Sequence, residues 1–399
     1  MKKIVTIIGA RPQIIKAAAL SRAIANQYSD QITEVIVHTG QHYDTNMSKV
    51  FIDELGIPNP NYNLNVGSAS HGMQTARMIE GLETILLDEK PDFLVLYGDT
   101  NSTLAGAIAA SKIHIPIVHI EAGLRSFNKK MPEEINRILC DHASTLLFSP
   151  TATGYNNLIR EGFNSDSQAP FHPDHPGIFH CGDIMYDNSL FFKELAKSKS
   201  DILEKYGLAD GQFILGTIHR NNNTDLPERL QAIFAALIEI AETYQENIVL
   251  PLHPRTSQLL EQNLGSDLYQ KLQSTPTIKI LPPVSFLDMI QLESNCKLVI
   301  TDSGGVQKEA YFFQKPGIIL RSETEWVEIV QEQAAIVTDA DKEKILSAYY
   351  HFRSTEIGLK FPPLFGDGKA AEFICETILG IEPRTHGTGA DCHDFYDWL

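Results

Sequence analysis

Apolar positions follow two patterns along the chain, short continuous runs and longer stretches with helical spacing. In the first 150 residues the short runs predict strands at 3–9, 34–40, 92–99, 116–123 and 145–150. Helical spacing predicts helices at 12–28, 101–113 and 132–144, with Asn101 or Ser102 as the cap of the second and Pro132 in the first turn of the third. Strands that alternate with helices in this way indicate a parallel sheet.

The pattern pauses at 164–188, where turn-forming residues predict a loop. It then restarts, with strands predicted at 211–219, 247–253, 277–281, 297–305 and 316–320, and helices at 226–244 and 306–313. We therefore expect an α/β protein with two doubly wound domains, residues 1–187 and 188–368, joined near 185–200.

Composition and charge narrow the classes of function. The 399 residues carry 33 basic and 50 acidic side chains, and the net charge of −17 argues against partners such as nucleic acid or an anionic membrane surface. No run of 18 or more apolar residues occurs, so no transmembrane helix is expected. The five cysteines are scattered without a C-x-x-C pair, which argues against a zinc site or a disulfide framework and favours a cytoplasmic location.

Polar residues stand directly after the predicted strands, where doubly wound sheets bind their ligands. They are Arg11, Gln41, His42, Asp99, Glu121, His219, His253 and the run from Asp302 to Gly305. Because they occur in both halves of the chain, they predict a single cleft between the two domains. The side chains expected to face an anionic ligand are Arg11, Lys16, Arg125, Arg137, His219, Arg220 and His253.

The stretch TDSGGVQKEA, residues 301–310, is the clearest sign of an anion site. Gly304 and Gly305 allow close approach to the backbone, and the following helix points free N–H groups at a ligand. Glu309, over a turn further on, could accept both hydroxyls of a ribose. A plain strand–turn–helix connection is the alternative. The absence of G-x-G-x-x-G and G-x-x-x-x-G-K-[ST] motifs argues against a dinucleotide redox enzyme and a P-loop NTPase.

The helix predicted at 132–144 carries charged residues toward the same strand ends. We expect its core-facing stripe to consist of Ile135, Ile138 and Leu139. Glu133 and Arg137, four residues apart, then share another face. An exposed ion pair on a helix surface is an equally good interpretation of these two residues.

Glu121 and Asp99 end two neighbouring predicted strands, close to the start of this helix. Together with Glu133 they would bring three carboxylates to one place, so at least one should hold a proton at neutral pH. A carboxyl group with a raised pKa is suited to general acid–base catalysis. A surface ion pair does not explain two acidic residues at strand ends.

Nine segments of the chain, in order, carry a resemblance to a known family. They are GARPQIIK (9–16), TGQHYD (39–44), YGDTNSTLAG (97–106), HIEAGLRS (119–126), MPEEINR (131–137), GDIMYD (182–187), TIHRNNN (217–223), LHPR (252–255) and TDSGGVQKEA (301–310). They resemble the non-hydrolysing UDP-N-acetylglucosamine 2-epimerases. That family implies two Rossmann-like domains facing a central cleft in a GT-B-like arrangement, a homodimer, and a C-terminal segment, 369–399, whose helix packs on the first domain.

The resemblance also implies a reaction, the inversion of carbon 2 of a UDP-sugar by elimination and re-addition of UDP through a 2-acetamidoglucal, without a metal or other cofactor. It implies that Asp99, Glu121 and Glu133 are the acid–base carboxylates and that His219 is catalytic. It implies substrate-binding roles for Arg11, Lys16, Arg137, Ser303, Gly304, Gly305 and Glu309. We also expect His253 to bind the substrate, because it follows a predicted strand.

The chain departs from the family pattern in places. TEWVE (324–328) stands where many members have T-E-R-P-E, so Trp326 replaces an arginine that contacts the nucleotide. QHYD (41–44) and HRNN (219–222) differ from the motifs of members that their own substrate regulates. GARPQ (9–13), MPEEINR (131–137) and TEWVE together are more similar to members that work in surface-polysaccharide pathways, some of which epimerise modified UDP-sugars such as diacetamido uronates. The alternatives are a GT-B glycosyltransferase, a hydrolysing epimerase and a non-catalytic sugar-nucleotide sensor.

Overall fold

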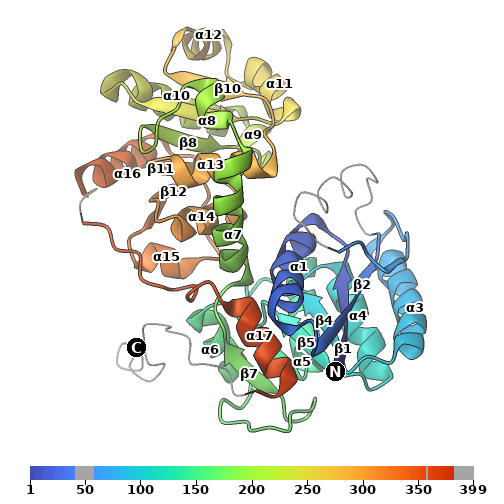
Figure 1. Cartoon of the computed structure of the whole chain (residues 1–399). Helices are drawn as coiled ribbons and strands as arrows, with labels where there is room; N and C mark the ends of the chain where they lie inside the picture. The colour runs from blue at the N-terminus through green and yellow to red at the C-terminus, as the bar shows by residue number, and fades with distance from the viewer. Residues whose placement is uncertain (41–57, 356–357, 382–399) are drawn as a thin grey trace. The chain divides into compact units, whose positions relative to one another are not determined.

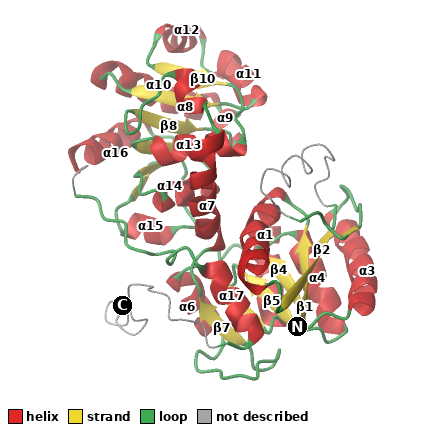
Figure 2. Cartoon of the chain, viewed as in Figure 1, coloured by secondary structure: helices red, strands yellow, loops and turns green. Residues whose placement is uncertain are grey.

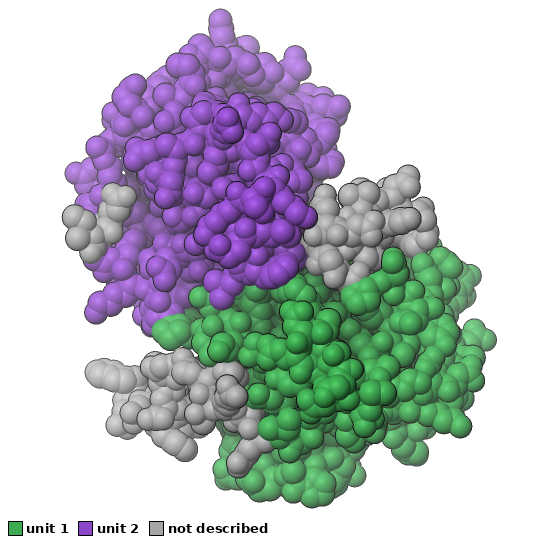
Figure 3. Space-filling model, in the orientation of Figure 1, with its two compact units in different colours: residues 1–188, 363–399 green, residues 189–362 purple. Residues whose placement is uncertain are grey.

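The computed structural model describes residues 1–40, 58–355 and 358–381. The chain divides into two compact units, unit 1 with residues 1–188 and 363–399, and unit 2 with residues 189–362 (Figures 1 and 3). Each unit has one sheet in which the paired strands run parallel, with helices packed against it (Figure 2). The predicted α/β class with two doubly wound sheets is confirmed. Within the described residues no helix is long and apolar enough to cross a membrane.

The sheet of unit 1 has the strand order β3-β2-β1-β4-β5-β6-β7. Its strands are β1 (Lys2–Ile8), β2 (Ile32–His38), β3 (Tyr62–Asn63), β4 (Phe93–Tyr97), β5 (Ile117–Ile120), β6 (Leu146–Ser149) and β7 (Gly177–His180). Its helices are α1 (Arg11–Ala23), which continues into a π-helical turn η1 (Ile24–Tyr28), α3 (His71–Glu89), α4 (Asn101–Lys112), α5 (Pro132–Ala143), α6 (Ala152–Arg160) and α17 (Ala370–Leu379). The boundary with unit 2 falls inside α7 (Ile184–Lys199).

The sheet of unit 2 has the equivalent order β10-β9-β8-β11-β12-β13. Its strands are β8 (Phe213–Thr217), β9 (Asn247–Pro251), β10 (Ile278–Leu281), β11 (Leu298–Thr301), β12 (Gly317–Ile319) and β13 (Ala335–Val337). Its helices are α8 (Ile202–Tyr206), α9 (Asn221–Thr224), α10 (Pro227–Tyr244), α11 (Pro254–Asn263), α12 (Ser266–Ser274), α13 (Phe286–Asn295), α14 (Gly304–Phe312), α15 (Val327–Gln331) and α16 (Lys342–Thr355).

The central strands are apolar almost throughout because helices cover both of their faces. In β4 the residues from Leu94 to Tyr97 are fully buried, and β8 and β11 are buried along their whole lengths. Such strands leave only their carboxyl ends, and the loops that follow, for polar side chains. The fold therefore places the chemistry at those ends in both units.

Local details differ from the sequence-based expectations at two places. The predicted loop at 164–188 contains the edge strand β7, which pairs with β6 through four residues and is too short to show a clear pattern. The cap of α4 is Thr100, one residue before the predicted positions, and its side chain accepts a hydrogen bond from the Thr103 backbone. Pro132 opens α5 as predicted.

Helix α17 comes from the far end of the chain and packs against α1 in unit 1. Phe373 makes an edge-to-face contact with Phe148 of β6, at 6.3 Å between ring centroids. The carboxylate of Asp187 accepts hydrogen bonds from the backbone N–H groups of Ala370 and Ala371, in the first turn of the helix. Burial is the main cause that raises the pKa of Asp187 to about 7.

Candidate active site

An ion pair lies at the carboxyl ends of the central strands of unit 1. The ammonium group of Lys16, on α1, contacts a carboxylate oxygen of Glu121, which follows β5. Both groups lie over Gly98 at the end of β4, since a Cβ atom built there would be 3.1 Å from each of them. Gly98 also has a φ of +60°, so a larger residue would be unfavourable there for two reasons. Lys16 and Glu121 are 13% and 10% exposed, which leaves them within reach of a small ligand.

Glu121 has a backbone conformation that side-chain-bearing residues rarely adopt, with a φ of +77°. Such a conformation costs about 1–3 kcal/mol and persists only where the surroundings fix it. Here the backbone N–H groups of Glu121 and Ala122 both donate to the carbonyl oxygen of Phe148, each at 3.0 Å. Strained backbone of this kind is often found at functional sites.

Asp99, directly after Gly98, forms a second ion pair. Its Oδ2 atom is 2.6 Å from Nη2 of Arg137, and its backbone carbonyl accepts a hydrogen bond from the amide of Asn136 at 2.8 Å. Both donors lie on α5. The sequence predicted that the carboxylates would converge, whereas the structure gives Asp99 and Glu121 a separate cation each.

The orientation of α5 is the main error of the sequence-based prediction. Ile135 and Leu139, expected in the core, are 37% and 43% exposed. The buried face is polar instead and consists of Glu134, Asn136, Cys140 and Asp141. The amphipathic pattern fails to predict the orientation of α5 because the helix packs against backbone groups that need polar partners.

The partner of Arg137 on α5 is Glu134 and not Glu133. Glu134 accepts from Nη1 of Arg137 at 2.9 Å and from the backbone N–H groups of Ser126 and Phe127 at 2.9 and 2.8 Å. Burial raises the pKa of Glu134, but these donors outweigh it and hold the pKa below its usual value. Glu133 is exposed at the start of the helix, where an incoming ligand could reach it.

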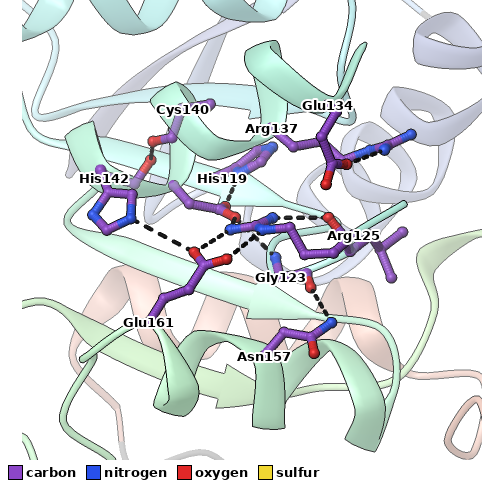
Figure 4. A network of polar contacts seen from close by, with 12 residues as sticks. His119, Gly123, Arg125, Glu134, Arg137, Cys140, His142, Asn157 and Glu161 are labelled. Carbon is purple, nitrogen blue, oxygen red and sulfur yellow. Dashed lines mark hydrogen bonds and ion pairs between the residues drawn. The ribbon is translucent and has the colours of Figure 1, made fainter. Parts of the chain in front are cut away.

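Arg125, predicted to face an anionic ligand, is instead committed to internal carboxylates. Its guanidinium contacts Asp141 and Glu161, each at 2.7 Å, and the side chain is 1% exposed (Figure 4). The prediction for Arg125 is therefore wrong. The pattern did not reveal it, because its partners Asp141 and Glu161 lie far from Arg125 in the sequence. Figure 4 also shows His119 within this network.

In unit 2 the corresponding strand ends surround the buried carboxylate of Asp302. It accepts hydrogen bonds from the backbone N–H groups of His219 and Arg220, at 3.2 and 3.1 Å, and from the amide of Asn223 at 3.1 Å. The side chain of His219 is 50% exposed, with Nδ1 3.6 Å from Asp302. Asp302 thus fixes the backbone that presents the imidazole.

The predicted nucleotide-binding residues meet at the start of α14. Ser303 caps the helix, with its hydroxyl accepting from the backbone N–H of Val306 at 3.4 Å, and Gly304 and Gly305 are the first helical residues. A Cβ atom on Gly305 would lie 3.9 Å from a carboxylate oxygen of Glu309. One helix end therefore combines free backbone N–H groups with an adjacent carboxylate.

Trp326 contacts the first turn of α14. Its indole N–H donates to the carbonyl oxygen of Gly304 at 2.9 Å, and the ammonium of Lys308 lies 4.2 Å from the ring centroid. The arginine near the turn is Arg321, whose Nη1 would lie 3.6 Å from a Cβ atom on Gly304. Arg321 is paired there with the carboxylate of Glu325, which lies at the same distance from that Cβ atom, so an ion pair stands beside Gly304.

The other predicted residues lie at the same edges without a distinctive geometry. Arg11 is the first residue of α1 and is exposed. His253 caps α11, and its Nδ1 atom accepts from the backbone N–H of Arg255 at 3.4 Å. Gln41 and His42 lie outside the described residues.

Comparison with known proteins places these features in one enzyme class. The model of the family described as UDP-N-acetylglucosamine 2-epimerase matches residues 24–379. A UDP-N-acetylglucosamine 2-epimerase homolog of Methanococcus maripaludis is 48% identical over 95% of this chain and 100% of its own length. The UDP-2,3-diacetamido-2,3-dideoxy-D-glucuronate 2-epimerase of Pseudomonas aeruginosa is 46% identical over the same shares of the two chains.

Solved structures support the same assignment. The UDP-GlcNAc 2-epimerase of Methanocaldococcus jannaschii superimposes with a TM-score of 0.81, at 41% identity, over 94% of this chain and 99% of that one. The same enzyme in complex with UDP-GlcNAc and UDP gives a TM-score of 0.76 at 41% identity, over the same shares. These neighbours are GT-B-like epimerases that act on nucleotide sugars. The chain belongs to the UDP-N-acetylglucosamine 2-epimerase family and is an isomerase.

Proposed function

We propose that this enzyme interconverts UDP-N-acetylglucosamine and UDP-N-acetylmannosamine by eliminating UDP and adding it back. The observation that carries the proposal is the pair of ion pairs, Lys16–Glu121 and Asp99–Arg137, at adjacent strand ends of unit 1. Carboxylates held beside cations, in partly buried positions, can exchange a proton with a sugar whose leaving group is a diphosphate.

Each step of the reaction has a group in the chain that suits it. A carboxylate among Asp99, Glu121 and Glu133 removes the proton from carbon 2, while the bond between carbon 1 and the UDP oxygen breaks. The product is 2-acetamidoglucal and UDP. UDP then re-forms its bond to carbon 1, and a proton returns to carbon 2 on the opposite face. The stereochemistry at carbon 2 is inverted, with no net oxidation or reduction.

Unit 2 holds the nucleotide in this proposal. The N-terminus of α14 at Ser303, Gly304 and Gly305 binds the diphosphate, and Glu309 accepts the ribose hydroxyls. His219, fixed by its backbone hydrogen bond to Asp302, stabilises the negative charge that develops on departing UDP. Arg11, Arg137 and His253 supply further positive or polar contacts to the substrate. No metal or cofactor takes part in the scheme.

A modified UDP-sugar is the second candidate substrate. The observation that favours it is the 46% identity to an enzyme named for a diacetamido glucuronate substrate. The TEWVE segment, in which Trp326 supports the Gly304 turn, is consistent with that likeness. The same chemistry at carbon 2 serves both sugars. A glycosyltransferase is less well supported, because it has no need of several carboxylates around a sugar.

We further propose a homodimer that works in the cytoplasm on precursors of surface polysaccharides, as the family resemblance implies. The exposed apolar side chains of α5 and the loop before it, Phe127, Met131, Ile135 and Leu139, are consistent with a surface that a second copy covers. Light scattering of the purified protein would test the dimer. A monomer at micromolar concentration would contradict it.

The decisive experiment is proton NMR of the reaction in heavy water, with UDP-N-acetylglucosamine and the diacetamido uronate in separate tubes. The elimination mechanism predicts deuterium at carbon 2 of the epimer and a slow release of UDP and glycal. Complete retention of the original hydrogen would contradict the elimination mechanism. Accumulation of free sugar would indicate a hydrolysing enzyme, and turnover of the uronate alone would identify the second candidate as the substrate.

A further inference from the structure

The backbone next to Asp99 and Glu121 contacts a cluster of charged residues that the proposed reaction leaves unused, part of which Figure 4 shows. The charged residues are His119 on β5, Arg125 in the following loop, Asp141 on α5 and Glu161 after α6. His119 and Asp141 are fully buried. Charges are costly to bury, so such a group calls for a reason.

His119 is held as an imidazolium by its two partners. Its Nδ1 atom lies 2.6 Å from Oδ1 of Asp141, and its Nε2 atom lies 2.8 Å from the carbonyl oxygen of Gly98. A carbonyl oxygen can only accept, and an ionised carboxylate can only accept, so both ring nitrogens carry hydrogen. Burial lowers the pKa of His119, but Cys140 and Asp141 outweigh it and hold the pKa well above its usual value.

The carboxylate of Asp141 interacts with three donors, all from residues 119–125. Besides His119, its carboxylate accepts from the backbone N–H of Gly123 at 3.1 Å and contacts Nη2 of Arg125 at 2.7 Å. Burial raises the pKa of Asp141, yet His119 and Arg125 outweigh it and keep the pKa below its usual value. Arg125 completes the charge balance by donating from Nε and Nη2 to Glu161, each at 2.7 Å.

The hydrogen bonds of His119 to Gly98 and of Asp141 to Gly123 involve the backbone next to the proposed acid–base residues. Gly98 immediately precedes Asp99, while His119 and Gly123 lie two residues before and after Glu121. Gly123 has a φ of +81°, and a Cβ atom there would come within 2.1 Å of the Gly154 carbonyl oxygen. The segment is therefore packed too closely to shift while the buried charges stay in place.

We propose that His119, Asp141 and Arg125 form a positioning unit that fixes the backbone of Asp99 and Glu121 in the orientation needed for proton transfer. The inference rests on the proposed function for the role of those two carboxylates. None of the three residues need touch the substrate. Without the unit, the backbone of Glu121 keeps its hydrogen bond to Phe148 but loses the support on either side, and we expect the carboxylate to shift relative to Lys16. The nucleotide-binding residues of unit 2 are unaffected.

The test compares two substitutions within the same cluster. Asp141→Asn keeps the shape but removes the charge that gathers His119, Gly123 and Arg125, and kcat should fall about 100-fold, as expected for a small misplacement of reacting groups. KM and the Kd for UDP should stay within about twofold. Glu161→Gln is the matched control, since Glu161 contacts Arg125 and His142 but not the backbone beside Glu121. Its kcat should stay within about twofold.

A purely structural ion-pair network would give a different result. Both variants would then melt at lower temperature while the folded enzyme kept its kcat, and that outcome overturns the proposal. An equal loss of kcat in Glu161→Gln would also overturn the proposal. Turnover would then depend on the charge of the cluster and not on its hydrogen bonds to the backbone of Gly98 and Gly123.

A measurement on the unaltered protein keeps the proposal falsifiable if Asp141→Asn does not fold. With ¹⁵N-labelled histidine, NMR should show two ring N–H protons for His119 throughout the range of about pH 5 to 8 in which an ordinary histidine titrates, assigned by their absence in His119→Gln. A single ring N–H, or titration in that range, would overturn the proposal. Failure of the wild-type enzyme to form any epimer would refute the proposed function instead, and the ring signals would still be readable.

Discussion

Apart from the additional edge strand β7 of unit 1, the two sheets have the same strand order, yet different chemical groups follow the equivalent strands. In each sheet the order reverses between its first and fourth strands, β1 and β4 in unit 1, β8 and β11 in unit 2. This reversal is where doubly wound sheets bind ligands. In unit 1 the acidic residues at that point, Asp99 and Glu121, are paired with side-chain cations. In unit 2 the buried Asp302 is surrounded by backbone N–H groups and an amide.

The difference matters because side chains and backbone do different chemistry. A carboxylate can take up and release a proton, and a neighbouring lysine or arginine stabilises its ionised form. Backbone N–H groups, such as those at Gly304 and Gly305, cannot exchange protons usefully, but they bind an anion without moving. We therefore assign proton transfer to unit 1 and nucleotide binding to unit 2. The predictions that follow test whether the two tasks can be separated.

The largest effect is expected from Asp99→Asn. Asparagine has the same shape and can still accept from Arg137, but it cannot take up a proton, so turnover should fall about a thousandfold. The Kd for UDP, measured by calorimetry, should not change, because the proposed UDP site is in unit 2. Near-normal turnover would remove Asp99 from the proton-transfer group.

Two adjacent glutamates give the next test. Glu133 is exposed, so Glu133→Gln should lower turnover about 100-fold without changing the melting temperature. Glu134 is 1% exposed and accepts from two backbone N–H groups. Glu134→Gln should therefore cost about 1–3 kcal/mol of stability and lower the melting temperature by a few degrees. If the two variants exchanged these effects, the role of Glu133 would pass to Glu134.

Glu309→Ala should affect binding and not proton transfer. A carboxylate that accepts a ribose hydroxyl makes a hydrogen bond of about 1.5–3 kcal/mol, so the Kd for UDP should rise by about 10- to 150-fold. At saturating substrate, kcat should change much less. Glu309→Gln keeps one good acceptor, so its Kd for UDP should lie between those of Glu309→Ala and the wild type. Unchanged UDP affinity in Glu309→Ala would place the ribose elsewhere.

The sequence could predict the strand ends because they depend on local patterns. Buried parallel strands appear as short apolar runs, and Gly98 after β4 marks a turn with a positive φ. That was enough to place Asp99, Glu121 and Ser303 just after the carboxyl ends of their strands. Spacing alone could not orient α5, since its buried Asp141 pairs with Arg125 and its buried Glu134 accepts from the backbone of Ser126, both outside the helix. Partners that lie far apart in the sequence leave no periodic signal.

The smallest effect concerns Trp326, which carries no charge and contacts the first turn of α14, where we propose that the nucleotide binds. Trp326→Phe removes the indole N–H that binds the Gly304 carbonyl but keeps a ring beside Lys308. A neutral hydrogen bond is worth about 1 kcal/mol, so the Kd for UDP should rise about fivefold, with kcat unchanged. Val327→Ala, at an exposed neighbouring position, is the control and should leave both constants as they are. Unchanged UDP affinity in Trp326→Phe would show that the turn holds its shape without Trp326. A loss of kcat alone would mean that the turn of unit 2 also takes part in proton transfer, and the division of tasks between the two units would have to be given up.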